Sequence, residues 1–283
     1  MPACRCRGAR CRGMGPISIP QGCQHAGGRV SGLSNPRNAL ERQPVDQQPI
    51  FNAPGVVIWL LTLFVAMHLL LWGVLPATES EWLVLALAFI PARIFGAAGD
   101  LPGGQVAVVT TFITHQFVHG NLPHLIVNSA WCLAFGTPIA RRMDAWRFLV
   151  FFVLCGVAGA LVYLAVNGDA RVLMIGASGS ISGLMGAAFR FVFRNLREPG
   201  ASGLPNTTRV PLLSLSETLR DRRILTMIIG WTVLNVLLAE VPGLTEAAGI
   251  AWEAHLGGFY AGLLLYGFFD RAALFAGDAA SAE

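Results

Sequence analysis

Charged residues are scarce in this chain of 283 residues. They make up 13% of it, whereas soluble domains carry about 25%, and apolar residues make up 54%. The mean hydropathy is +0.58. This composition excludes an ordinary soluble domain and predicts an integral membrane protein.

The placement of the cysteines argues against a disulfide framework. Of the six cysteines, Cys4, Cys6, Cys11 and Cys23 precede the first long apolar run, and Cys132 and Cys155 lie within apolar runs. No pair is expected to face an oxidising compartment. The CRCRGARC cluster fits no zinc spacing well, and HExxH is absent. We therefore expect no metal and no cofactor. A site at His115 and His119, which are four residues apart, is a less favoured alternative.

Six apolar runs approach the roughly 20 residues that a bilayer-crossing helix needs. They cover residues 55–76, 122–140, 148–167, 178–193, 224–240 and 253–270, numbered here as spans one to six. The run 82–92 is too short, so we interpret it as an interfacial segment of a long outer loop over 77–112. We predict an all-α membrane protein with six transmembrane helices.

The sequence has no lysine, and its 20 arginines are unevenly distributed. They gather before span one, between spans two and three, between spans four and five, and after span six. The positive-inside rule then places both termini in the cytoplasm. The basic charge is thus explained by topology, and we expect a lipid bilayer and no nucleic acid as partner. The arginine-only basic set and the high glycine and alanine content suggest a bacterial inner membrane.

The rest of the chain divides around these spans. Residues 1–54 are polar and lack helical periodicity, which predicts a disordered cytoplasmic leader. Residues 55–271 form the predicted membrane domain, with a cytoplasmic linker over 195–222. Residues 272–283 form a cytoplasmic tail.

Three polar residues from different spans are expected at one depth in the outer half of the bilayer. Asn128, Ser178 and His255 each lie near the start of a span that runs inward. Helix rise places them roughly 18–22 Å above the inner ends of their spans, in a core of about 30 Å. Polar groups at such depth are costly and indicate a functional site.

A serine beside a histidine is a nucleophile with its general base. The oxyanion produced by attack on a carbonyl needs preorganised donors. His124 and Asn128 share one helix face and offer side-chain N–H groups, and the first amides of span four are free. No carboxylate is expected to orient His255, because Glu253 points elsewhere on its helix. The residues therefore predict a Ser178–His255 dyad.

Small residues would allow the two helices to approach. Gly258 and Gly262 follow His255 at a GxxxG spacing, and Gly179, Gly183 and Gly186 follow Ser178. Such residues permit close helix packing in lipid. Asn235 in span five is expected to make an interhelical hydrogen bond.

Three motifs, in this order, resemble the rhomboid family of intramembrane serine proteases: HGNLPHLIVN, GASG and AHLGGFYAG. The resemblance covers about residues 55–270. It implies a six-helix rhomboid bundle with a catalytic dyad of Ser178 and His255, and an oxyanion site that includes His124 and Asn128. It also implies supporting roles for His119, Gly176, Gly179, Gly258 and Gly262. The implied substrates are transmembrane proteins, cut near their outer ends at helix-destabilising, small-residue sequence.

The sequence departs from the family pattern at three places. Thr110 and Thr111 replace a Trp-Arg pair, and Ala140 replaces a glutamate thought to tie down the outer loop, although Arg142 is retained. Ser182 replaces an aromatic residue that often stacks on the catalytic histidine. Its hydroxyl is a candidate hydrogen-bond partner for the imidazole.

Other interpretations remain open at this point. Ser178 can be a packing serine, and Ser182 is a rival nucleophile. A catalytically silent rhomboid-like binder of membrane clients is the main alternative function. A transporter is less favoured, because the chain shows no internal repeat.

The topology can be tested with fusions to alkaline phosphatase, which becomes active only outside the bacterial cytoplasm. A fusion after Asp169, between spans three and four, is expected to be active, and one after Arg220 is expected to be inactive. Activity at Arg220 without activity at Asp169 would reverse the predicted orientation.

Overall fold

The computed structural model describes residues 53–192, 211–239 and 251–270. The predictions for the leader up to residue 52, for most of the 195–222 linker and for the tail fall outside the described residues. The described part of the linker includes the short helix α9, which is capped by the side chain of Ser214.

The described residues form helices, and no strand occurs among them. The α-helices are α1 (Gly55–Leu69), α2 (Ala77–Leu87), α3 (Gly104–Thr114), α4 (Leu122–Trp131), α5 (Thr137–Ala140), α6 (Ala145–Asn167), α7 (Ser178–Ala188), α9 (Leu215–Arg220), α10 (Arg222–Ala239) and α11 (Trp252–Leu265). π-Helical turns extend α1 over Leu70–Val74 and join α4 to α5 over Cys132–Gly136. Short 3₁₀ turns cover Pro91–Arg93, Ala97–Asp100, His115–Phe117 and Tyr266–Phe268.

Each of the six predicted spans coincides with helix in the structure. The helical stretches Gly55–Val74 and Ala145–Asn167 are long and apolar enough on their own to cross a membrane. The all-α prediction is confirmed for the described residues. The count of six crossings and the position of the termini stay predictions.

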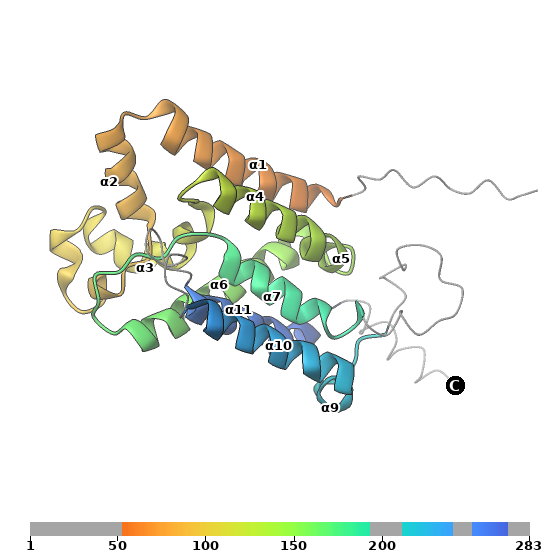
Figure 1. Cartoon of the computed structure of the whole chain (residues 1–283). Coiled ribbons are helices and arrows are strands. Elements are labelled where there is room, and N and C mark those ends of the chain that lie inside the picture. Colours follow the sequence, from red (N-terminus) through yellow and green to blue (C-terminus); the bar gives the residue numbers. More distant parts are fainter. Residues whose placement is uncertain (1–52, 193–210, 240–250, 271–283) are drawn as a thin grey trace, which may run out of the picture. The chain divides into compact units, whose positions relative to one another are not determined.

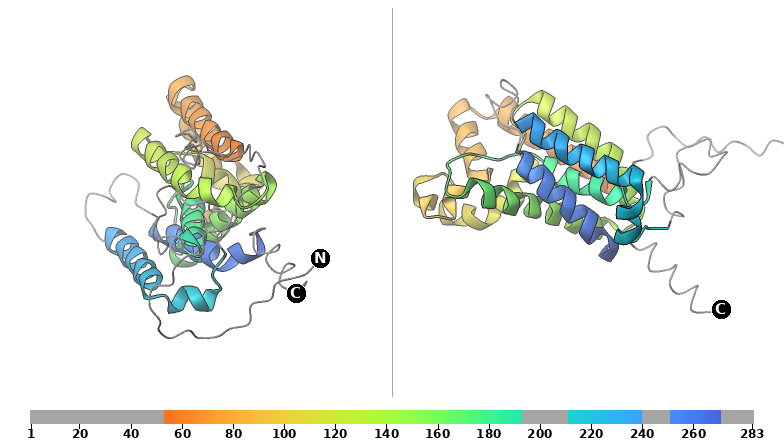
Figure 2. Two further views of the ribbon diagram at one scale, coloured as in Figure 1. Left: turned by 90° about the vertical axis from the view of Figure 1, so that its right-hand side faces the viewer. Right: turned by 60° about the horizontal axis from the view of Figure 1, so that its bottom comes forward.

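Helix α7 is the central element of this bundle. It packs against α6 and α11 on one side and against α4 and α5 on the other (Figure 1). Each residue from Gly179 to Ala188 is buried, so the helix has no lipid-facing surface over this range. Figure 2 shows α10 on the outside of the bundle, alongside α11.

Glycines bring α7 and α11 into backbone contact. A Cβ atom on Gly258 would overlap the carbonyl oxygen of Gly179, and one on Gly262 would overlap that of Gly183. Any larger residue on α11 would push the two helices apart. The predicted approach of these two faces is therefore present in the structure, and it fixes the position of the residues at the start of both helices.

The segment 77–112, predicted as an outer loop, contains two helices and a buried arginine. The Arg93 side chain is 2% exposed. Its guanidinium donates to the carbonyl oxygens of Pro102 at 2.7 Å and Leu85 at 2.5 Å, and so connects the end of α2 to the start of α3. A backbone bridge between Phe89 and Met174 joins this segment to the chain before α7. Arg93 thus links two parts of this segment from within.

The expectation that position 140 lies where a side chain could tie down the outer loop was wrong. Ala140 and Arg142 lie at the end of the bundle opposite α2 and α3, so this position cannot tie down the outer loop (Figure 1). Arg142 forms a buried ion pair with Asp270 beyond α11. Its guanidinium also lies 4.6 Å from the ring centre of Phe191. Arg142 therefore connects the turn after α5 to the segment after α11 at this end of the bundle.

The contact between α7 and α11 predicts that Gly258→Ala destabilises the fold by roughly 1–3 kcal/mol or more, because the methyl group meets backbone that cannot move aside. Thermal unfolding in detergent measures this loss. Gly230→Ala on α10 is the matched control, since nothing lies within 4 Å of a Cβ atom there. Equal stability of the two variants would contradict the proposed backbone contact.

Candidate functional site

One pocket of about 620 Å³ is lined by four of the predicted site residues: His124, Asn128, Ser178 and His255. Its size is typical of ligand and substrate sites. Its polar lining includes Asn121, His124, Asn128, Ser178, Ser182, Asn235 and His255, and its apolar walls include Trp131, Phe135, Ile181, Met185 and Trp231. The structure thus brings residues of α4, α7, α10 and α11 to one cavity.

Ser178 is the first residue of α7 and is half-buried at the pocket wall. The preceding turn is set by Gly176, whose φ of 114° lies in the region that favours glycine. The N–H of Gly176 donates to the carbonyl of His115 at 2.9 Å. Within the described part of the chain, the Ser178 hydroxyl has no side-chain hydrogen bond, so it is free to act towards the pocket.

The neighbouring serines have different surroundings. The Ser180 hydroxyl donates to Oε1 of Gln116 at 2.8 Å, and both side chains are fully buried. Ser180 is therefore a structural residue that joins α7 to the turn before α4. Ser182 is 5% exposed and also lines the pocket, one turn after Ser178.

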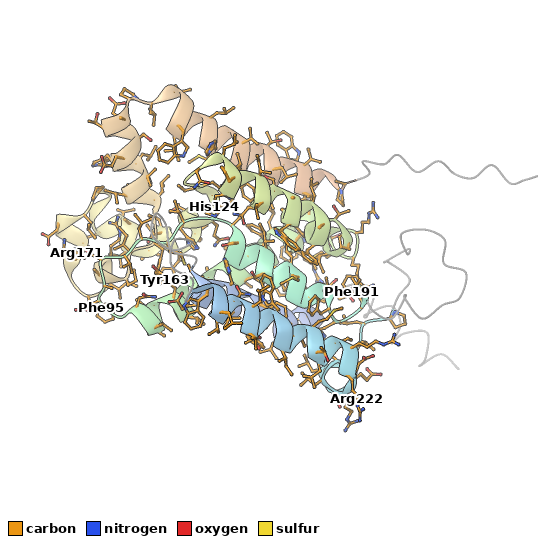
Figure 3. All side chains as sticks on the ribbon, viewed as in Figure 1. Phe95, His124, Tyr163, Arg171, Phe191 and Arg222 are labelled. Atoms are coloured by element: carbon orange, nitrogen blue, oxygen red, sulfur yellow. The ribbon has the colours of Figure 1, made fainter. Side chains whose placement is uncertain are left out.

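His124 and Asn128 lie beside the turn that precedes Ser178. A Cβ atom on Gly176 would lie 2.6 Å from Nε2 of His124 and 3.9 Å from Nδ2 of Asn128. Both nitrogens are thus next to the backbone two residues before the serine. Figure 3 shows His124 at the start of α4, near the segment that leads into α7.

Local hydrogen bonds fix the backbone at His124 and the side chain of Asn128. The Asn121 side chain caps α4 by accepting from the N–H of His124 at 2.8 Å. Asn128 donates one of its amide hydrogens to the carbonyl of His124 at 3.0 Å. Its second amide hydrogen is left for a group in the pocket.

His255 lies in the first turn of α11 and reaches the same pocket. The start of α11 touches α7 directly, because a Cβ atom on Gly179 would lie 3.3 Å from the carbonyl oxygen of Ala254. The residues next to Ser178 and His255 in the sequence are therefore in contact.

The hydrogen-bond partner of the imidazole differs from the one expected. Nδ1 of His255 lies 2.9 Å from Oδ1 of Asn235 on α10, and Ser182 does not take this place. The predicted interhelical hydrogen bond of Asn235 is present. Glu253 accepts from Asn167 of α6 at 3.1 Å and, as predicted, does not orient His255.

His119 is placed behind the pocket wall. Its ring is fully buried and packs edge-on against His124, with ring centres 5.2 Å apart. Its backbone carbonyl accepts from the indole N–H of Trp72, next to α1, at 2.9 Å. His119 thus contacts both Trp72, in the π-helical turn that extends α1, and the ring of His124.

His115 is committed to its own helix. Its Nδ1 contacts the carbonyl of Thr111 at 2.7 Å. Burial lowers the pKa of His115 to about 4, although the Thr111 hydrogen bond acts in the opposite direction, so the imidazole is neutral at pH 7. In the described ranges, no group of three or more His, Cys, Asp or Glu side chains is arranged to hold a metal. The leader cysteines lie outside these ranges.

Three contributions to the site do not follow from the sequence. The partner of His255 comes from α10, and only a three-dimensional arrangement pairs Asn235 with that imidazole. The support for Gly176 is the backbone carbonyl of His115, which every residue type has. For Arg93, the only sequence feature that indicated a structural role was its position in a loop with few other basic residues.

Comparison with known proteins gives two findings. The model of the Rhomboid domain matches residues 107–272. A protein of Arabidopsis thaliana described as RHOMBOID-like protein 4 is 24% identical over 153 residues, which are 53% of this chain and 31% of that protein. The chain thus spans about a third of that relative's length.

The different roles of Ser178 and Ser180 can be separated by stability. Ser180→Ala leaves the buried carbonyl oxygen of Gln116 without its partner, so we expect a loss of roughly 1–3 kcal/mol in unfolding free energy. Ser178→Ala removes an uncommitted hydroxyl and is expected to cost much less. Chemical denaturation in mixed micelles compares the two. An equal loss would contradict the assignment of Ser180 as the structural serine.

Proposed function

The chain belongs to the rhomboid family, and we propose that it is an intramembrane serine endopeptidase that uses Ser178 and His255 as a catalytic dyad. The single observation that carries this proposal is the shared pocket. It combines an uncommitted serine hydroxyl, an imidazole and two side-chain N–H donors. Three helices, α4, α7 and α11, supply these groups, and a serine that only packs would not require such an arrangement.

In the proposed reaction, Nε2 of His255 takes the proton of the Ser178 hydroxyl, and Oγ attacks the carbonyl carbon of a substrate peptide bond. The position of Ser178 at the start of α7 favours this step. The first amides of the helix lack helical acceptors, and the helix dipole favours negative charge there.

The negative oxygen that forms in this step needs donors aimed at it. His124 and Asn128 lie beside Gly176 and are suited to this role, together with the backbone N–H of Ser178. His255 then gives its proton to the leaving amine, and the carbonyl stays bonded to Ser178 as an ester. A water molecule, activated in the same way, hydrolyses the ester and restores the hydroxyl.

The proposed substrates are membrane proteins whose transmembrane segments enter the pocket from the bilayer. The pocket walls fit this assignment, since Trp131 of α4, Phe135 of the π-helical turn that follows it and Trp231 of α10 present apolar surface next to the polar groups. We place the enzyme in a bacterial inner membrane, with six crossings and both termini in the cytoplasm. The chemistry needs no cofactor.

A silent rhomboid-like binder is the second candidate. It is favoured by one observation: Ser182 stands where many relatives have an aromatic residue beside the catalytic histidine. Such a binder would hold membrane clients in the same pocket without cutting them.

The decisive assay uses purified protein in detergent or liposomes with a single-span model substrate. We expect wild type to cut it, and we expect Ser178→Ala and His255→Ala each to reduce the rate by at least about 10³-fold. Ser180→Ala is the matched control, because it removes a hydroxyl two residues away and is expected to cut at temperatures where it is folded.

The remaining outcomes separate the alternatives. Cutting that survives both Ser178→Ala and His255→Ala would refute the dyad. Loss of cutting with a chelator would favour a metal site. Binding of the substrate without cutting by wild type would favour the silent binder.

A further inference from the structure

The side chain that faces the proposed catalytic base comes from α10. Asn235 is 2% exposed, and its Oδ1 lies 2.9 Å from Nδ1 of His255. This bond connects two helices that have few other polar contacts. It lies at the edge of the pocket, which both residues line.

The hydrogen bonds of Asn235 determine the direction of this contact. Its Nδ2 donates to the carbonyl oxygen of Trp231, one turn earlier on α10, at 2.8 Å. The amide nitrogen is thus turned towards its own helix, and the oxygen faces the imidazole. An amide oxygen can only accept, so Nδ1 of His255 must carry the hydrogen.

This arrangement selects one form of the neutral imidazole. With the proton on Nδ1, the lone pair is on Nε2. That is the nitrogen that must take the proton of the Ser178 hydroxyl if His255 is the base. In other serine hydrolases, a buried carboxylate fixes the tautomer in this way. Here Glu253 is engaged with Asn167, and within the described ranges Asn235 is the partner of Nδ1.

We propose that Asn235 is a positioning residue, which fixes the tautomer and orientation of His255 through the Oδ1···H–Nδ1 hydrogen bond. This inference rests on the proposed function. The proposed site then comprises Asn235, His255 and Ser178, which come from α10, α11 and α7. The activity then depends on a side chain that α10 supplies to His255.

A second hydrogen bond joins the same helices and provides a control. The hydroxyl groups of Thr232 and Tyr260 lie 2.7 Å apart, about one turn from Asn235 along α10. This pair contributes to the docking of α10 but does not touch His255. Removing this hydrogen bond therefore tests the effect of helix docking while the partner of His255 is kept.

The kinetic test compares three variants in the cleavage assay, with rates expressed per folded protein. Asn235→Leu keeps the branched shape but removes the acceptor, and we expect kcat to fall roughly 10- to 100-fold with little change in KM. Asn235→Asp keeps an acceptor oxygen at the same place and is expected to recover most of that loss. Thr232→Val is expected to leave kcat unchanged.

A spectroscopic test does not depend on activity. In protein labelled with ¹⁵N-histidine, the His255 signals, identified by their loss in His255→Ala, are expected to show a protonated Nδ1 and an unprotonated Nε2. In Asn235→Leu we expect a mixture of the two tautomers, and in Thr232→Val the wild-type pattern.

Two results would overturn the inference: a wild-type tautomer and kcat in Asn235→Leu, or an equal loss in Thr232→Val, which would assign the effect to helix docking. Failure of the proposed function has a different signature. Wild type would then not cut, or would cut without Ser178, and the ¹⁵N spectra would still decide whether Asn235 sets the tautomer.

Discussion

The backbone contact between α7 and α11 is the constraint on which the other features depend. Gly179 and Gly183 on one helix face Gly258 and Gly262 on the other, with no room for a side chain between them. Apolar side chains gain little from association in lipid, so close backbone packing is the available means of holding two helices in a fixed register. This register places Ser178, at the start of α7, beside the first turn of α11.

The polar groups of the pocket avoid buried charge. Ionised groups at membrane depth are expensive, and a buried carboxylate needs several partners. The pocket that His255 lines also contains neutral amides, two serines and a second histidine, while the nearby Glu253 accepts a hydrogen bond from Asn167. An amide acceptor at position 235 can orient an imidazole without adding a charge. The same neutral chemistry applies to the donors of His124 and Asn128.

Much of this arrangement followed from the sequence because it depends on periodicity. Apolar runs predicted where the helices lie, and glycine spacing predicted which faces of α7 and α11 meet. The features that were missed depend on tertiary contacts. The partner of His255 lies 20 residues away on another helix. The anchor of the 77–112 segment is a buried arginine bonded to two backbone carbonyls, which no motif encodes. The role that the resemblance gave to position 140 was wrong, because Ala140 ends span two on the side that the arginine distribution predicts to be cytoplasmic.

The central claim is that the Ser178 hydroxyl is activated by His255, and chemical labelling tests it most directly. A fluorophosphonate probe, which reacts with activated serines, is incubated with the protein in detergent, and the modified residue is identified by mass spectrometry of the digested chain. The account predicts one adduct on Ser178, which is lost in His255→Ala. An adduct on Ser182, or labelling of Ser178 that is unaffected by His255→Ala, would contradict it.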